Sequence, residues 1–183
     1  MKNVADFIYE AGMLKRLPRS GYAFLGGGSE NVAEHSFLIS VIAFALAKME
    51  DDIDTGRLVS MCLLHDLPEA RTGDLNYVQK KYCDSHEERA VSHQAKGLPF
   101  GDDYLSLINE FNEGKTRESL LAKDADQLAF VHDLRMLMDT GHKGADKWLD
   151  VVLSRITTDT GKALAQAMVE RSWDGWWMDG YSE

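Results

Sequence analysis

Hydrophobic residues recur every three or four positions along nearly the whole chain, which is the spacing of amphipathic α-helices rather than of strands. One such stripe, in the stretch VAEHSFLISVIAFALAKM, consists of Leu38, Ile42, Ala45 and Met49. Just before this stretch, position 31 is an asparagine, and a glutamate follows three positions later. This pair is an Asn variant of the capping box and predicts that a helix begins near residue 32.

The same periodicity predicts helices at about residues 2–15, 32–49, 56–66, 85–96, 102–112, 116–139, 143–157 and 159–172. No stretch alternates as a half-buried strand does, and no repeat or low-complexity tail is present. The longest irregular stretch, RLPRSGYAFLGGGSEN, is too long and too Gly-rich for a simple connector and is typical of loops that line sites. The length of 183 residues suits one core, so we predict an all-α fold: a single compact domain over residues 1–183, built from six to eight helices.

Charge and cysteine content restrict the partners. The chain has 20 basic and 30 acidic residues, a net charge of −10, which opposes binding to nucleic acid or to an anionic membrane. A small anionic substrate remains compatible, because a local arginine or a metal ion outweighs a distant acidic surface. No apolar run has the length of a membrane span or the form of a signal peptide. Cys62 and Cys83 lack CxxC spacing and are predicted to be reduced thiols, so we expect a cytoplasmic protein.

Two histidines lie on the apolar faces of their predicted helices. At about 100° per residue, His35 shares a face with Leu38 and Ile42, and His65 shares one with Leu58. A single inward histidine is more often a hydrogen-bonded core residue. Here Asp66 adjoins the second histidine, and an unpaired carboxylate is very costly to bury. A divalent cation with imidazole and carboxylate ligands removes this cost.

A further ligand is expected from the stretch LLAKDADQLAF. Asp126 shares its helical face with the small residues Ala122 and Ala129, so we expect it to point inward. Asp124 is rotated by about 160° from it and is predicted to be solvated. The expected metal ligands come from three helices and leave coordination positions open for water and substrate. They are His35, His65, Asp66 and Asp126.

Proline 68 follows the His-Asp pair by two residues. It cannot donate a helical hydrogen bond, so we expect the helix to end just past Asp66 and Leu67 to become extended. The following segment EARTGD would then cross the metal site and bring Glu69 and Asp74 close to it. Two carboxyl groups beside a metal suit the activation of water and the protonation of a leaving group. A plain helix stop followed by solvated acids is the alternative.

The segments VAEHS, LLHDLPEARTGD and AKDADQL contain, in this order, a His, a His-Asp pair and a distal Asp. This ordered set resembles the HD-domain metal-dependent phosphohydrolases, and the form HDLPEARTGD is similar to their 5′-deoxynucleotidase branch. The resemblance covers about residues 14–130. It implies an all-helical HD domain that forms a homodimer and hydrolyses nucleoside 5′-monophosphates, with the helices at 140–175 packed on the motif core.

The resemblance also implies roles for individual residues. The four ligands would bind one divalent transition metal, with Mn²⁺, Co²⁺, Zn²⁺, Fe²⁺ and Ni²⁺ equally compatible. Arg19 would orient the substrate phosphate, since its planar fork meets two phosphate oxygens at once. Glu69 and Asp74 would be the acids beside the scissile phosphate, and Tyr77 would contact the nucleoside. Relatives that strictly reject ribose are expected to carry a Trp directly after the arginine, whereas Ser20 follows here. The bulky ring that excludes a 2′-hydroxyl is therefore missing or supplied by Tyr22, so the sugar preference stays open.

Three other functions keep parts of this site. A phosphodiesterase would need a second metal, for which His86 and His93 are the nearest candidates, although their polar surroundings are typical of solvated histidines. A sensor that binds metal and nucleotide would not need the two acids of the EARTGD segment. A redox di-iron enzyme would need more histidine ligands. The Trp-rich tail SWDGWWMDGY is expected to pack on the core or on a partner subunit rather than to cover the site.

Overall fold

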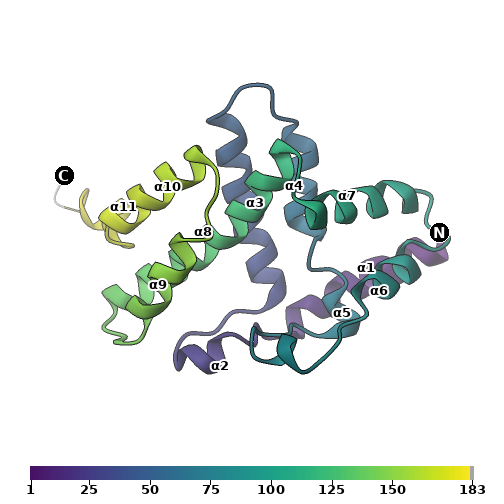
Figure 1. Ribbon diagram of the computed structural model, residues 1–183, viewed down its shortest axis with the longest axis horizontal. Helices are drawn as coiled ribbons and strands as arrows, with labels where there is room; N and C mark the ends of the chain where they lie inside the picture. The colour runs from purple at the N-terminus through teal and green to yellow at the C-terminus, as the bar shows by residue number, and fades with distance from the viewer. Residues whose placement is uncertain (182–183) are drawn as a thin grey trace.

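The computed structural model describes residues 1–181, and Figure 1 shows that they form an all-α fold. All eight helices predicted from the periodicity are present in this part of the chain. They are α1 (Lys2–Met13), α3 (Val32–Lys48), α4 (Thr55–Leu64), α6 (Glu87–Ala95), α7 (Gly101–Glu113), α8 (Arg117–Asp139), α9 (Ala145–Leu153) and α10 (Asp159–Glu170).

Short helical turns were not predicted, because a single turn is too brief to show a hydrophobic period. Three are α-helical, namely α2 (Tyr22–Leu25), α5 (Glu69–Thr72) and α11 (Gly175–Met178), and two are 3₁₀ turns, η1 (Leu14–Arg16) and η2 (Gln79–Lys81). The described residues contain no strand, only an isolated antiparallel bridge between Pro18 and Asn31. The helix count therefore exceeds the expected six to eight only through these single turns.

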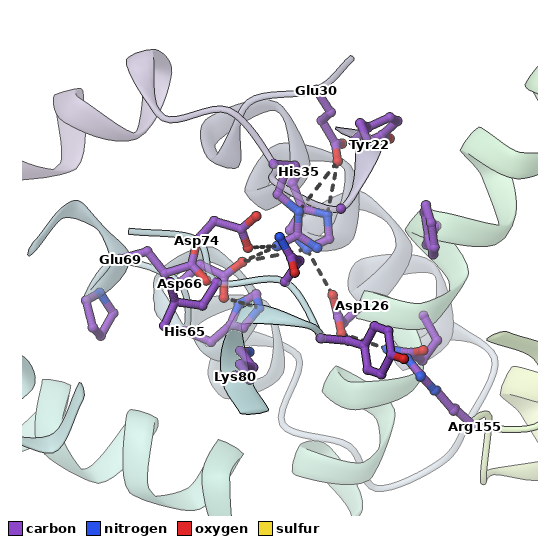
Figure 2. A pocket seen from close by; sticks show the side chains of 18 of the residues that line it. Tyr22, Glu30, His35, His65, Asp66, Glu69, Asp74, Lys80, Asp126 and Arg155 are labelled. Carbon is purple, nitrogen blue, oxygen red and sulfur yellow. Dashed lines mark hydrogen bonds and ion pairs between the residues drawn. The ribbon is translucent and has the colours of Figure 1, made fainter. Parts of the chain in front are cut away.

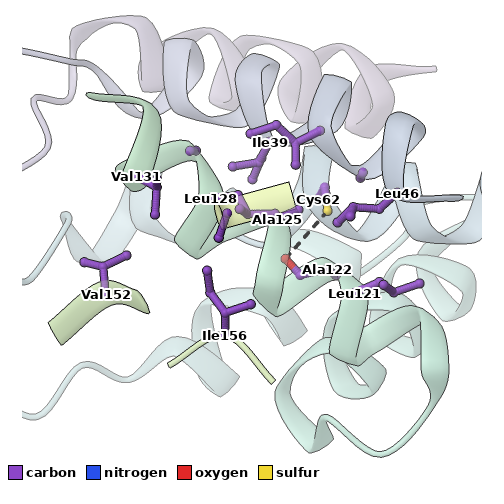
Figure 3. Close-up of a cluster of buried hydrophobic side chains, with 14 of the residues drawn as sticks. Ile39, Leu46, Cys62, Leu121, Ala122, Ala125, Leu128, Val131, Val152 and Ile156 are labelled. Atoms are coloured by element: carbon purple, nitrogen blue, oxygen red, sulfur yellow. Dashed lines mark hydrogen bonds between the residues drawn. The ribbon is translucent and has the colours of Figure 1, made fainter. Parts of the chain in front are cut away.

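Helices α3, α4 and α8 pack against one another, and α9 and α10 cover the far side of α8. Figure 3 shows side chains from these helices meeting in the larger hydrophobic core, where Ile39, Leu46 and Leu128 are fully buried. A smaller core gathers α1, α6 and α7 around Tyr104. The long helix α8 is thus central, and a residue on it can reach either α3 or the C-terminal helices.

The two cores meet where the predicted metal ligands lie. Along α3, Val32 belongs to the smaller core and Ile39 to the larger one, and His35 lies between them. After α4 the same change occurs between Met61 in the larger core and Leu67 in the smaller one. The polar site therefore occupies the seam between two apolar regions.

Helix α3 begins as predicted. The Glu34 amide donates to Asn31 Oδ1 at 3.0 Å, and the Asn31 amide donates to Glu34 Oε2 at 2.9 Å, which completes the capping box. The predicted stripe is only partly correct, because Ala45 and Met49 are exposed. Helix α3 is apolar around most of its circumference, so a hydrophobic residue on it does not indicate the buried face.

The prediction that Asp124 is solvated is wrong. Its side chain is completely buried, and its two carboxylate oxygens accept four hydrogen bonds. Oδ1 accepts from the amide and hydroxyl of Thr157 at 2.8 and 3.2 Å, and Oδ2 accepts from those of Thr158 at 2.8 and 2.6 Å. Four donors compensate the lost hydration of the carboxylate, so it ties the α9–α10 connection to α8.

Cys62 is buried and Cys83 exposed, and neither is in a disulfide, as predicted. No helix in the described residues has the length and apolar character needed to cross a membrane. The indole rings of Trp173 and Trp176 both pack edge-on against Trp177, beside α10. The cytoplasmic location stays a prediction.

Candidate metal and phosphate site

The two predicted histidine ligands present the same ring nitrogen to one point. His35 is 1% exposed, and its Nε2 lies 2.9 Å from Asp126 Oδ1. His65 follows the last turn of α4, and its Nδ1 lies 3.0 Å from the Cys62 carbonyl oxygen. A carbonyl oxygen only accepts, so Nδ1 of His65 donates this bond and Nε2 is the ring nitrogen that faces the site. This arrangement is that of imidazoles prepared to bind a metal.

One group of side chains in the described part of the chain is placed to share an ion. Its members are His35, His65 and Asp126, whose ligand atoms all lie within 4.8 Å of one another. Two imidazole nitrogens and one carboxylate suit a divalent transition metal, so the residues present fit the ion that the sequence implies. His86 and His93 are exposed and do not join the group, so the two-metal phosphodiesterase gains no support.

Asp66 lies at the site but outside this group. Its Oδ1 is 3.1 Å from His65 Nε2, and its Oδ2 is 3.7 Å from His35 Nε2. The same Oδ2 accepts a hydrogen bond of 3.2 Å from Arg19 Nη1. Asp66 therefore bridges the histidines and the arginine, and its role as a metal ligand stays a prediction.

Arg19 reaches the site because its backbone is paired with the start of α3. Its amide donates to the Glu30 carbonyl oxygen at 2.9 Å, and the Val32 amide donates to the Leu17 carbonyl oxygen at 3.0 Å. The guanidinium then lies 3.2 Å from Asp66 and 3.5 Å from Asp74. The side chain is 23% exposed, so it is held beside the ligands while still open to an incoming anion.

The segment after Pro68 brings two more acids to the site, although not by the predicted path. Residues 65–68 form hydrogen-bonded turns, so Leu67 does not become extended, and α5 begins directly afterwards. Glu69 lies on α5, and Gly73, with a φ of +79°, turns the chain back. Asp74 then accepts a hydrogen bond from the Ser20 amide and faces the arginine.

Glu69 is buried without a partner for one of its oxygens. The side chain is 8% exposed, and Oε2 has no hydrogen-bond partner among residues 1–181. Burial, together with the negative charges of Asp66 and Asp74, raises the pKa of Glu69 to about 9. In the metal-free protein Glu69 therefore holds its proton at neutral pH.

Two of the ligands are electrostatically coupled. Burial by itself lowers the pKa of His35, but the carboxylates of Asp126 and Glu30 outweigh it and raise the pKa to about 10. Burial opposes ionisation of Asp126, yet its hydrogen bond to His35 and the neighbouring positive charges hold its pKa well below the usual range. The metal-free site is thus an imidazolium–carboxylate pair at neutral pH.

Metal affinity is therefore expected to rise with pH. A protonated imidazole has no lone pair to donate, so the metal must displace the proton of His35. Between the ordinary histidine pKa of 6.5 and the raised value of about 10, the apparent Kd should fall by up to about tenfold per pH unit. Competition titrations against a chelating dye at pH 6.5, 7.5 and 8.5 measure this slope. The exposed His86→Ala variant should show the same slope, and an affinity independent of pH would contradict the pairing.

Figure 2 shows the cavity into which these side chains point, and its volume is about 470 Å³. All eight site residues predicted from the sequence line it. They are Arg19, His35, His65, Asp66, Glu69, Asp74, Tyr77 and Asp126. A nucleotide-sized ligand fits a cavity of this volume.

Sequence reasoning missed part of the wall. Phe130 packs edge-on against Trp148 at 5.9 Å between ring centroids, and Arg155 extends from the α9–α10 connection toward Asp126. Phe111 packs at 4.5 Å from the His65 ring. Phe130 follows the predicted ligand Asp126 by four residues, about one helical turn, so the sequence could have placed Phe130 in the wall. Nothing in the local sequence marks Trp148 or Arg155, because only the packing of α9 on α8 brings them near.

The comparison with known families decides the assignment. Residues 11–170 match the family model described as HD domain. The chain belongs to the HD-domain family. This confirms the resemblance based on the ordered histidines and aspartates.

Individual relatives narrow the assignment within the HD-domain family. It is 29% identical over 143 residues to the protein named 5′-deoxynucleotidase HDDC2 of Dictyostelium discoideum, covering 72% of this chain and 75% of the other. It is 25% identical over 148 residues to the human protein of the same name, covering 78% and 72%. A solved structure of a conserved hypothetical protein from Pyrococcus furiosus superposes with a TM-score of 0.75 at 27% identity, covering 91% of this chain and 99% of the other. The chain is therefore an HD-domain phosphohydrolase related to the 5′-deoxynucleotidases at modest identity.

Proposed function

We propose that this HD-domain phosphohydrolase hydrolyses nucleoside 5′-monophosphates to nucleoside and phosphate. The observation that carries the proposal is the meeting of three kinds of group in one cavity. A His/Asp cluster, an arginine and two further carboxyl groups face the same space. The names of the relatives, 5′-deoxynucleotidases, support this choice of substrate.

The proposed metal site consists of His35, His65, Asp66 and Asp126. A divalent cation bound there would polarise the phosphate and acidify the attacking water. The protein fixes the orientation of the ligands. The Cys62 carbonyl oxygen accepts from the ring of His65, and Asp126 Oδ1 lies 2.9 Å from His35 Nε2. Bound substrate would be oriented by the cluster at the seam of the two cores.

Arg19 is proposed to bind the phosphate. Its planar guanidinium offers paired donors that match two phosphate oxygens. Asp66 and Asp74 hold the group in place at 3.2 and 3.5 Å, so little side-chain entropy remains to be lost when a phosphate arrives. During the reaction the positive charge would offset the negative charge that develops on the phosphate oxygens.

The two acids are proposed to divide the proton transfers. Glu69 is buried and protonated in the metal-free protein, which suits a donor to the departing 5′-oxygen. Asp74 accepts a hydrogen bond from the Ser20 amide and lies beside Arg19, a position that suits a base for the attacking water.

Two variants separate these roles. Glu69→Gln and Asp74→Asn should each lower kcat for a nucleoside monophosphate by about a hundredfold or more. A p-nitrophenyl phosphate substrate has a leaving group that needs no proton, so it should restore activity to Glu69→Gln but not to Asp74→Asn. Steady-state kinetics with both substrates test the division. Rescue of Asp74→Asn instead would exchange the two roles.

The nucleoside is proposed to lie along the segment that follows Asp74. Tyr77 lines the cavity and is 62% exposed, with Lys81 Nζ 4.3 Å from its ring centroid, and we place the exposed part of this ring against the sugar or base. Tyr22 cannot serve as a free ring, because its hydroxyl is bonded to Asp133 and its ring packs edge-on against Phe130. The residue directly after Arg19 is Ser20, which has no ring to exclude a ribose 2′-hydroxyl, so we propose that ribonucleotides are accepted too.

Phosphate release from a panel of deoxy- and ribonucleoside 5′-monophosphates tests the function. Metal-stripped protein is assayed with and without Mn²⁺, Co²⁺ or Zn²⁺. We expect release that requires metal and a deoxy-to-ribo ratio of kcat/KM near one. Failure to hydrolyse any monophosphate while metal is bound would refute the proposed activity, and a ratio well above ten would refute the sugar tolerance.

We also propose that the protein forms a homodimer, supported by an exposed apolar face of α3. Phe37, Val41 and Phe44 lie at helical spacing and are 69%, 50% and 53% exposed. Such a stripe without charged residues can pair with its own copy across a two-fold axis.

The double variant Phe37→Glu/Phe44→Glu should convert the dimer to a monomer, because it places like charges at the centre of this face. Sedimentation velocity measures the change. The exposed Tyr82→Glu variant, away from α3, should leave the mass unchanged. A wild-type monomer at micromolar concentration would contradict the proposal.

A further inference from the structure

We infer that Glu30 positions the metal ligand His35, fixing which of its ring nitrogens is free to bind the ion. Glu30 lies in the Gly-rich loop before α3 and was not among the residues selected from the sequence. The inference deepens the proposed function, since it names a positioning residue for the same metal site. It concerns the affinity for metal and does not depend on which phosphate ester is hydrolysed.

The imidazole of His35 has a carboxylate beside each of its ring nitrogens. Figure 2 shows Glu30 and Asp126 approaching this ring from two sides. Glu30 Oε2 lies 3.5 Å from Nδ1, and Asp126 Oδ1 lies 2.9 Å from Nε2. A carboxylate beside Nδ1 holds the proton on that nitrogen, which leaves Nε2 as the ligand atom that faces His65 and Asp126.

His65, the other histidine of the site, is also held at its Nδ1. The Cys62 carbonyl fixes Nδ1 of His65 at 3.0 Å, so both imidazoles present Nε2. Among the described residues, Glu30 is the side chain that pairs with Nδ1 of His35, whereas Asp66 and Asp126 lie at Nε2. Without Glu30, when a metal displaces one proton of the imidazolium, the remaining proton would no longer be fixed on Nδ1, and part of the population would present the wrong nitrogen.

Glu30 is held through its backbone and through its side chain, in both cases by Arg19. Its carbonyl oxygen accepts the Arg19 amide at 2.9 Å, and its carboxylate lies 4.0 Å from Arg19 Nε. The side chain is 12% exposed, so little room remains for it to swing away. The capping box of α3 uses Glu34 instead, which leaves Glu30 without a role in starting the helix.

The experiment compares Glu30→Ala and Glu30→Gln with the control Glu34→Ala. Glu34 precedes the same histidine by one residue and supports the helix start, but its carboxylate bonds to the Asn31 amide rather than to an imidazole. The readouts are the Kd for Mn²⁺ or Zn²⁺ from chelator competition and the melting temperature of the metal-free protein. Both are independent of the substrate assay.

We expect Glu30→Ala to weaken metal binding by about tenfold or more. Glu30→Gln should weaken it less, because the amide oxygen still accepts from Nδ1. In a His35→Ala background, Glu30→Ala should cause no further loss, since the ring that it positions is gone. Glu34→Ala should lower the melting temperature while its folded form retains the wild-type Kd.

An unchanged Kd in Glu30→Ala would overturn the inference. So would an equal loss of affinity in the His35→Ala background, because the effect would then not pass through the imidazole. The proposed activity can fail separately: a wild-type protein that binds metal but hydrolyses no monophosphate refutes the function, and the binding measurements still decide the role of Glu30.

Discussion

Asp126→Asn is expected to remove nearly all metal-dependent phosphate release. The carboxylate is the only acidic member of the three-residue cluster, and its ionised form is strongly stabilised at the site. A neutral amide is a poor ligand for a divalent cation and leaves its charge unbalanced between two imidazoles. Losing about 4 kcal/mol of transition-state stabilisation corresponds to about a thousandfold lower kcat/KM.

Metal titration and steady-state kinetics on the same sample measure this effect. The amide oxygen introduced by this substitution can still accept a hydrogen bond from His35, so the metal-free fold should be retained, and circular dichroism checks that it is. Wild-type turnover in Asp126→Asn would show that the site has been placed wrongly.

Asp66→Asn is the informative comparison for the ligand set. If Asp66 is a ligand, its substitution should weaken metal binding, as that of Asp126 does. If it is a partner of Arg19 alone, the substitution should leave the Kd for metal unchanged and raise KM for the phosphate. The proposed four-residue ligand set requires the first result.

Asp124→Ala is expected to cause the largest loss of stability. The substitution removes a buried carboxylate that accepts four hydrogen bonds and leaves the Thr158 amide and the proton of its hydroxyl without an acceptor in the interior. Bonds to charged groups contribute about 1.5–3 kcal/mol each, and orphaned buried donors add a further cost. Allowing for coupling between bonds that share one carboxylate, we expect a loss of about 3–5 kcal/mol in the free energy of unfolding.

For a chain of this length such a loss lowers the melting temperature by roughly 10 °C. Thermal unfolding of metal-free protein measures it. Thr157→Val, which removes a single hydroxyl donor, should cost only about 1 kcal/mol. A melting temperature within about 2 °C of wild type would contradict the structural role of Asp124.

Local sequence signals predicted what short-range physics controls. The period of hydrophobic residues located all eight longer helices, and the Asn31–Glu34 pair located the start of α3 because both halves of a capping box lie within one turn. The inward direction of His35 also followed from the helical period.

The same reasoning failed where the partner is distant. Asp124 was predicted to be solvated because it lies about 160° around the helix from Asp126, yet Thr157 and Thr158 supply four donors from the α9–α10 connection. A helical wheel shows which residues share a face, but not what covers that face. The exposed end of the α3 stripe, Ala45 and Met49, has the same explanation.

The amino-acid sequence specifies the chemical groups of this protein: two histidines and several carboxyl groups at helical positions, with an arginine in a Gly-rich loop. How these groups meet depends on the packed fold, in which Asp126 joins the histidines and Asp66 pairs with Arg19. The fold also places Glu30 behind His35 and Arg155 in the cavity wall. Residue type and helical period are local properties, whereas distances between residues far apart in the chain depend on how the helices pack.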